Sequence, residues 1–372
     1  MNLFAKTNFW IGGSLLTIAS LFSQNEPCLP SCQPEPCPPP CQDCEPKACA
    51  ADPITTYCTM GRGCWDLFAT ASFIYWSPSQ DNMELGIVSQ TDTLYALHGD
   101  EINLDTAYQP GFKLGFGTNL KQGNWDMYLQ YTWFRSKQET SESLAAADGK
   151  VLLAAELIPL SGHRFLDGKE DWRLYMDLLD LELGKHYSVQ TDLFFRPFFG
   201  LRAAWIRQNL ETDYLNESTG KNQHNISIVQ KSNSWALGLR TGLSTDWMVG
   251  KCFRVYGNGN GDLLFTQYSN LSTKQQGTTT TGALASNSLY AVKQHNINCV
   301  RGRLELELGL GWGTYFSNNN RYVDLSAGYG FQIFFDQNMF RNFLDDTALA
   351  KSISPNGNLY IHGLTATVRL DF

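Results

Sequence analysis

The sequence predicts an all-β protein, an antiparallel transmembrane β-barrel over residues 64–372 that follows a disordered Cys/Pro-rich N-terminal tether. Three observations predict it. Apolar and polar residues alternate with a period of two, the alternating segments run for about ten to sixteen residues where soluble strands cluster near ~5–6, and tryptophans stand at their ends. Beyond the first 25 residues no apolar run approaches the ~18 that a membrane-spanning helix needs. A polytopic helical membrane protein is therefore excluded.

The alternation is clearest near the C-terminus. Residues 304–312 place four leucines and a tryptophan on one face, with charges and glycines on the other. Residues 192–207, 235–247 and 364–372 show the same pattern. A soluble sandwich would also alternate, but charges and glycines on the wet face are typical of a lumen that faces water.

The spacing of the tryptophans fits a bilayer. Trp125 and Trp133 are eight residues apart on one face, which corresponds to ~26 Å along a strand and ~20 Å in height at a ~40° tilt. Trp235 and Trp247 are twelve apart, giving ~40 Å and ~30 Å. The two heights lie on either side of the ~25 Å apolar band that aromatic girdles flank in outer-membrane barrels.

Ten strands can be counted. Short and long connections alternate strictly, as the periplasmic turns and external loops of outer-membrane barrels do. Further β-like segments at 84–90, 151–157, 226–230 and 289–293 could raise the count to twelve or fourteen, and a phase change near Leu178 and Leu179 suggests a bulge. The expected strands are 65–76, 109–120, 124–136, 171–187, 192–207, 233–248, 252–267, 300–316, 321–335 and 358–372.

The N-terminal region divides into an expected signal peptide, residues 1–23, and a periplasmic tether, residues 24–63. Proline prevents helix or central strand in the tether. Its C-x-x-C spacing lacks a second ligand pair, so disulfides in an oxidising envelope, within the chain or to other envelope proteins, are favoured over a metal site. The disulfide candidates are Cys28, Cys32, Cys37, Cys41, Cys44, Cys49, Cys58 and Cys64.

The chain ends on an alternating strand with Phe372 as its last residue. A carboxy-terminal aromatic strand of this kind resembles the assembly signal of bacterial outer-membrane barrels. With a signal peptide at the other end, Phe372 is expected to serve as that signal.

Charges of both signs are expected on the inner face. They would either filter solutes across a water-filled pore or pair with one another and plug a narrow barrel, and ten strands would favour the plug whereas fourteen would favour a pore. The expected pore-lining residues are Arg196, Arg202, Arg240, Arg254, Arg303, Glu305, Glu307, Asp324 and Arg369.

No motif for catalysis, phosphate binding or a metal centre is present, so no catalytic residue, cofactor or metal is expected. The net charge of −8 argues against a nucleic-acid partner.

Several stretches together resemble the pore-forming major outer membrane protein family of Legionella and of chlamydia-like bacteria such as Simkania. They are residues 73–76, 81–85, 125–129, 180–185, 196–206, 256–264, 304–312 and 363–372. The resemblance implies a porin in the bacterial outer membrane that contacts lipid and passes small hydrophilic solutes or ions. The alternative is a structural or adhesive envelope protein with a plugged barrel, cross-linked through its cysteines. The sequence does not decide whether the protein forms a homo-oligomer.

Overall fold

The computed structural model describes residues 67–89, 99–120, 124–145, 148–154, 165–216, 222–250, 252–281, 284–316, 321–343, 352–353 and 357–372. All of them belong to one compact unit, Cys49–Phe372. The expected signal peptide, the tether and the eight disulfide candidates lie outside the described residues. They remain predictions.

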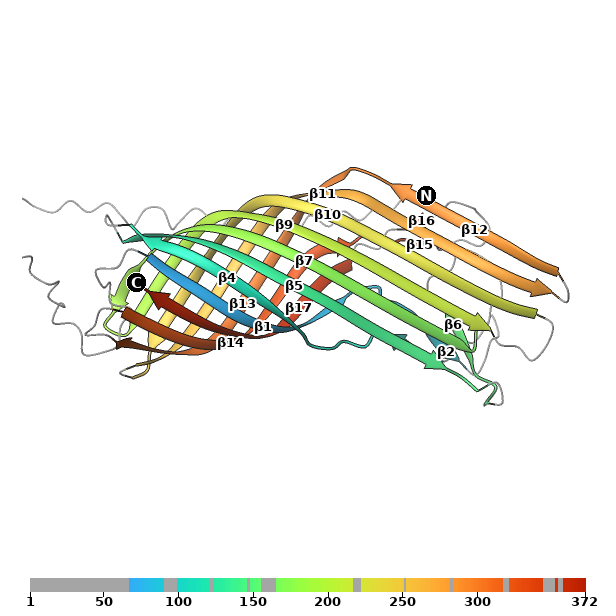
Figure 1. The fold of residues 1–372 in the computed structure, drawn as a ribbon, viewed down its shortest axis with the longest axis horizontal. Helices are drawn as coiled ribbons and strands as arrows, with labels where there is room; N and C mark the ends of the chain where they lie inside the picture. The colour runs from blue at the N-terminus through green and yellow to red at the C-terminus, as the bar shows by residue number, and fades with distance from the viewer. Residues whose placement is uncertain are drawn as a thin grey trace, which may run out of the picture. The chain divides into compact units, whose positions relative to one another are not determined.

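Ten antiparallel strands close into a barrel (Figure 1). Each strand pairs with its neighbours in chain order, and the last pairs with the first, so the barrel wall has no free edge. All ten coincide with strands expected from the sequence, and most extend further on the long-loop side. They are β1 (Leu67–Gln80), β4 (Gln109–Asn119), β5 (Trp125–Ser143), β7 (Asp167–Lys185), β9 (Leu193–Asn216), β10 (Asn222–Met248), β11 (Phe253–Thr281), β13 (Ile297–Phe316), β14 (Arg321–Asn338) and β17 (Gly357–Asp371).

The remaining described strands add no further strand to the closed wall, and one of them only continues β7 beside β9. Three form a separate sheet in the order β3-β2-β6, and β12 prolongs the sheet beside the long end of β11. The barrel therefore keeps ten strands, and the higher counts of twelve or fourteen are not found. These strands are β2 (Glu84–Ser89), β3 (Gly99–Asn103), β6 (Val151–Ala154), β8 (Tyr187–Gln190), β12 (Leu284–Gln294), β15 (Asn342–Phe343) and β16 (Ser352–Ile353).

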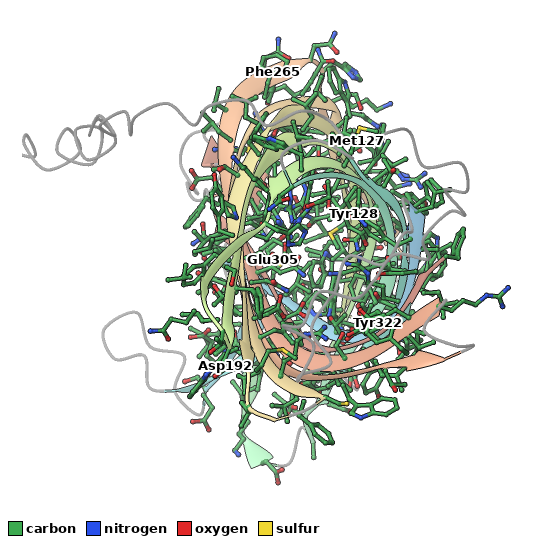
Figure 2. The ribbon with its side chains drawn as sticks, turned by 90° about the vertical axis from the view of Figure 1, so that its left-hand side faces the viewer. Met127, Tyr128, Asp192, Phe265, Glu305 and Tyr322 are labelled. Carbon is green, nitrogen blue, oxygen red and sulfur yellow. The ribbon has the colours of Figure 1, made fainter. Side chains whose placement is uncertain are left out.

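Near the short turns the apolar side chains point away from the lumen, as the alternation predicts. Leu306 is 53% exposed and Val368 is 41% exposed, whereas Arg303 is 2% exposed. Figure 2, with Met127 and Tyr128 labelled, views the barrel along its long axis. A soluble sandwich would bury both Leu306 and Val368, so the outer face is one that lipid can cover.

Toward the long loops the two faces exchange their chemistry. On β7, Asp180 and Glu182 face inward near the turn, but Trp172, Leu174 and Met176 face inward further along the strand. The pairing of β7 with β5 and β9 continues through Leu178 and Leu179 without a shift in register. The expected bulge was wrong: the phase change marks the level at which the inner face turns from polar to apolar.

Phe372 closes the seam of the barrel. Its backbone N–H donates a hydrogen bond of 3.1 Å to the carbonyl of Leu67, next to the paired β1 and β17. Its side chain is 44% exposed, on the outer face. This position is compatible with an assembly signal, which stays a prediction.

Candidate functional site: the barrel lumen

All nine charges expected to line a pore lie on the inner face of the barrel, where they make ion pairs and hydrogen bonds rather than standing singly. Eight of them also line one interior cavity, and Asp324 lies behind Arg254. The nine are Arg196, Arg202, Arg240, Arg254, Arg303, Glu305, Glu307, Asp324 and Arg369.

Asp262 is the centre of the pairing. Its side chain is fully buried, and it contacts Arg202 at 2.6 Å, Arg303 at 2.9 Å and Arg240 at 3.4 Å. These four residues come from four consecutive strands of the wall, β9, β10, β11 and β13. One carboxylate thus neutralises part of three guanidinium charges that would otherwise repel one another at close range.

Glu305 continues this layer across the lumen. It accepts a hydrogen bond of 2.9 Å from Arg303, and Lys113 on β4 approaches it to 3.8 Å. Because β1, β17 and β14 separate β4 from β13 in the wall, this contact crosses the interior. Glu305 is labelled inside the barrel in Figure 2.

A second group of charges lies closer to the short turns. Asp126 accepts a hydrogen bond of 2.9 Å from Nε of Arg196 and lies 3.0 Å from Nε2 of His186. On the other side of the lumen, Arg254 pairs with Asp324 and lies 2.8 Å from Asp246.

These charges surround a cavity of about 250 Å³, which is room for several water molecules. Hydroxyl, amide and charged groups make up most of its lining. It reaches from His186 and Asp246 beside the short turns to Trp76 and Arg202 further up the barrel. Glycine at position 309 lets the ring of Tyr256, which lines the cavity, pack against β13: a Cβ at Gly309 would lie 2.5 Å from that ring.

An apolar cluster, here called the plug, fills the lumen on the long-loop side of the cavity. Eight barrel strands contribute to it, and Met83 and Phe340 enter it from the loops. Eight of its seventeen members are completely inaccessible and the others are at most 6% exposed, so they fill the lumen at this level. The plug consists of Ile74, Trp76, Met83, Phe134, Trp172, Leu174, Met176, Leu178, Ala204, Ile206, Leu210, Ala236, Leu264, Phe334, Phe340, Leu359 and Ile361.

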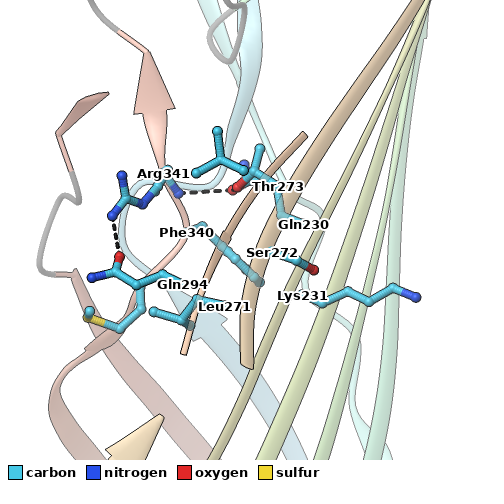
Figure 3. A pocket seen from close by; sticks show the side chains of 10 residues that line it. Gln230, Lys231, Leu271, Ser272, Thr273, Gln294, Phe340 and Arg341 are labelled. Atoms are coloured by element: carbon cyan, nitrogen blue, oxygen red, sulfur yellow. Dashed lines mark hydrogen bonds between the residues drawn. The ribbon is translucent and has the colours of Figure 1, made fainter. Parts of the chain in front are cut away.

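The loop after β14 is fastened beside the plug (Figure 3). The backbone N–H of Arg341 donates a hydrogen bond of 2.9 Å to Gln230, and its guanidinium donates to Gln294. Phe340 is 3% exposed between these anchors. Loop residues, and not only the wall, therefore hold the plug closed.

The sequence prediction missed both the plug and several polar residues of the cavity. Lys113 and Asp126 were not expected to face the lumen. Strand periodicity could have found Asp126, which alternates with the outward Trp125 and Met127. The plug gave one signal only, the phase change on β7 at Leu178.

Among the described residues, no group of three or more His, Cys, Asp or Glu is arranged to hold a metal ion. None of the described segments is a helix long and apolar enough to cross a membrane. Cys252 and Cys299 are only partly buried.

Comparison with known families identifies the barrel. Residues 60–372 match the family model described as Legionella pneumophila major outer membrane protein precursor. The chain belongs to this family. The family member described here is accordingly a β-barrel protein of the bacterial outer membrane. No curated protein matches the chain.

Solved structures with a similar arrangement are distant from this family member. The outer membrane protease OmpT of Escherichia coli shares 9% identity over 82% of this chain and 96% of its own, with a TM-score of 0.35. The toluene transporter TodX of Pseudomonas putida shares 9% over 82% and 89%, at 0.30, and a FadL homologue of Pseudomonas aeruginosa shares 6% over 82% and 90%, also at 0.30. Likenesses at this level carry no argument about function.

Proposed function

We propose that the protein is an outer-membrane porin, without an enzyme centre, that admits small hydrophilic solutes by passive diffusion and is closed by the plug in the conformation described here. The observation that carries the proposal is the polar cavity in the membrane-spanning part of the lumen. Replacing buried ion pairs by packed apolar side chains is often neutral or stabilising. A barrel that served only as a wall would gain nothing from so many interior charges.

The position of the plug also supports a channel that can open. Met83 and Phe340 belong to loops and not to the barrel wall. Local opening of a loop costs less free energy than local opening of the strands of a closed sheet. Withdrawal of these two side chains would loosen the plug without breaking a pairing between barrel strands.

Planar-bilayer recording of the refolded protein tests the proposal. We expect discrete openings in the wild type, and a shift of selectivity toward cations in an Arg196→Glu variant, because Arg196 borders the cavity. Reversing one charge ~7 Å from a permeating ion changes the energy of that ion by ~1 kcal/mol in water. Because a cation gains this energy and an anion loses it, the cation-to-anion permeability ratio should change by roughly thirtyfold. Unchanged reversal potentials would show that Arg196 does not line the path of the permeating ions.

A second candidate is a structural or adhesive envelope protein, favoured by the complete burial of Trp172 and Phe134 in the plug. Such a protein would stay silent in the bilayer. If the tether cross-links chains, high-mass species from envelopes should collapse when reductant is added before electrophoresis. Without such species, the tether would be a monomeric spacer.

A further inference from the structure

The outer face of the barrel carries a row of tryptophans on the long-loop side. Trp133 on β5 is opposite Asp177 on β7, which is opposite Trp205 on β9, which is opposite Trp235 on β10. Strand tilt makes such a row climb by ~3 Å per strand. These indoles indicate the interfacial zone in which hydrocarbon gives way to headgroups.

Cations follow in the next two rows away from the short turns. The first row holds Arg135, Tyr175 and Arg207, and the second holds Lys137, Arg173, Asn209 and Lys231. We call the five basic residues of these rows the basic belt: Arg135, Lys137, Arg173, Arg207 and Lys231. The belt spans four neighbouring strands, β5, β7, β9 and β10.

Two guanidinium groups share one aromatic ring in the belt. The guanidinium carbons of Arg135 and Arg207 lie 5.5 Å and 5.6 Å from the ring centre of Tyr175. Arg135 is neutralised by Asp177 at 2.8 Å. Arg207 makes no ion pair with any residue that the structure describes. Its positive charge is thus held beside that of Arg135, and no described carboxylate pairs with it.

The upper row is only partly neutralised. Asp171 contacts both Lys137, at 3.1 Å, and Arg173, at 2.9 Å, and Glu139 also pairs with Lys137. Lys231 is exposed and, within the described part of the chain, forms no ion pair. Arg207 and Lys231 are diagonal neighbours across β9 and β10, a geometry with Cβ atoms ~7–8 Å apart. One anion could contact both side chains.

We propose that the basic belt binds the phosphate of an outer-leaflet lipid, with Arg207 and Lys231 as its direct ligands. The tryptophan row sets the level of the acyl chains, and the two free cations lie where a lipid headgroup would be. Guanidinium and ammonium groups are the usual protein ligands of phosphate. The inference does not depend on whether the lumen conducts.

The full chain, refolded in detergent micelles, can be titrated with bis-phosphorylated lipid A and the bound lipid counted by native mass spectrometry. We expect an Arg207→Gln/Lys231→Gln variant to bind about thirty-fold more weakly, the combined contribution of two basic side chains at an anionic surface. A Lys185→Gln/Arg321→Gln variant also removes two cations, but beside the short turns at the other end of the barrel. It should bind like the wild type.

Three results would overturn the proposal: equal affinity of the Arg207→Gln/Lys231→Gln variant and the wild type, equal binding of lipid A from which the phosphates have been removed, or displacement of lipid A by millimolar inorganic phosphate. The last would make the belt a site for a free anion. Both exchanged residues are on the outer surface and make no ion pair with a described residue, so a folding defect is not expected. The heat-dependent gel mobility of the barrel checks this.

Discussion

Replacing Trp172 and Phe134 together by alanine should turn a mostly closed barrel into a persistently open one. Both side chains are fully buried in the plug, on the inner sides of the neighbouring strands β7 and β5. Burying a large apolar side chain contributes ~1.5–3 kcal/mol, so their removal takes ~3–6 kcal/mol from the closed conformation. An equilibrium between closed and open barrels should shift by more than a hundredfold.

The measurement is the open probability of single channels in a planar bilayer. Leu239→Ala is the matched control, since Leu239 is 66% exposed on the outer face and touches no part of the lumen path. The double variant is also expected to unfold more readily, because truncating a buried aromatic residue costs ~3–5 kcal/mol. If the variant folds and remains as silent as a structural barrel would be, the plug is not a gate.

Replacing Asp262 by asparagine should lower the free energy of unfolding by about 3–5 kcal/mol. Removing one partner of a buried ion pair leaves the other charge uncompensated, and Asp262 serves three arginines at once. Urea-dependent unfolding in lipid vesicles, followed by tryptophan fluorescence, measures the effect.

Asp371→Asn supplies the comparison for Asp262→Asn. Asp371 pairs with Arg369 at 2.7 Å, but each of the two side chains is 20% exposed. The free energy of unfolding should therefore fall by less than ~1 kcal/mol. Equal effects of the two substitutions would show that the central layer contributes no more than a peripheral pair.

The wall of the barrel is predictable from sequence because, along each strand, residues that face lipid alternate with residues that face the lumen. Leu304 to Trp312 place every apolar side chain outward, and the structure keeps that assignment. The ion-pair partners are not predictable in the same way. Lys113 and Glu305 belong to strands that do not touch, and only the closure of ten strands brings them together.

The plug escaped prediction for a different reason. Above the tryptophan row the surroundings change from lipid to water, so the favourable arrangement of the two faces reverses. A strand that crosses this level, such as β7 at Leu178, shows a change of phase that sequence alone cannot distinguish from a bulge. The loop contributions of Met83 and Phe340 have no periodicity at all.

Cysteine accessibility at two positions of β14 and one position of β9 tests most directly whether the outer face meets lipid while the inner face meets water. In a background with all ten native cysteines replaced by serine, single substitutions Ser326→Cys, Leu325→Cys and Ala204→Cys are compared in lipid vesicles with a charged thiol reagent. Ser326 lines the cavity, Leu325 is 43% exposed on the outer face, and Ala204 is buried in the plug. We predict rapid labelling at position 326 and protection at positions 325 and 204. Labelling at position 325 with protection at position 326 would contradict a lipid-facing outer wall around a hydrated lumen.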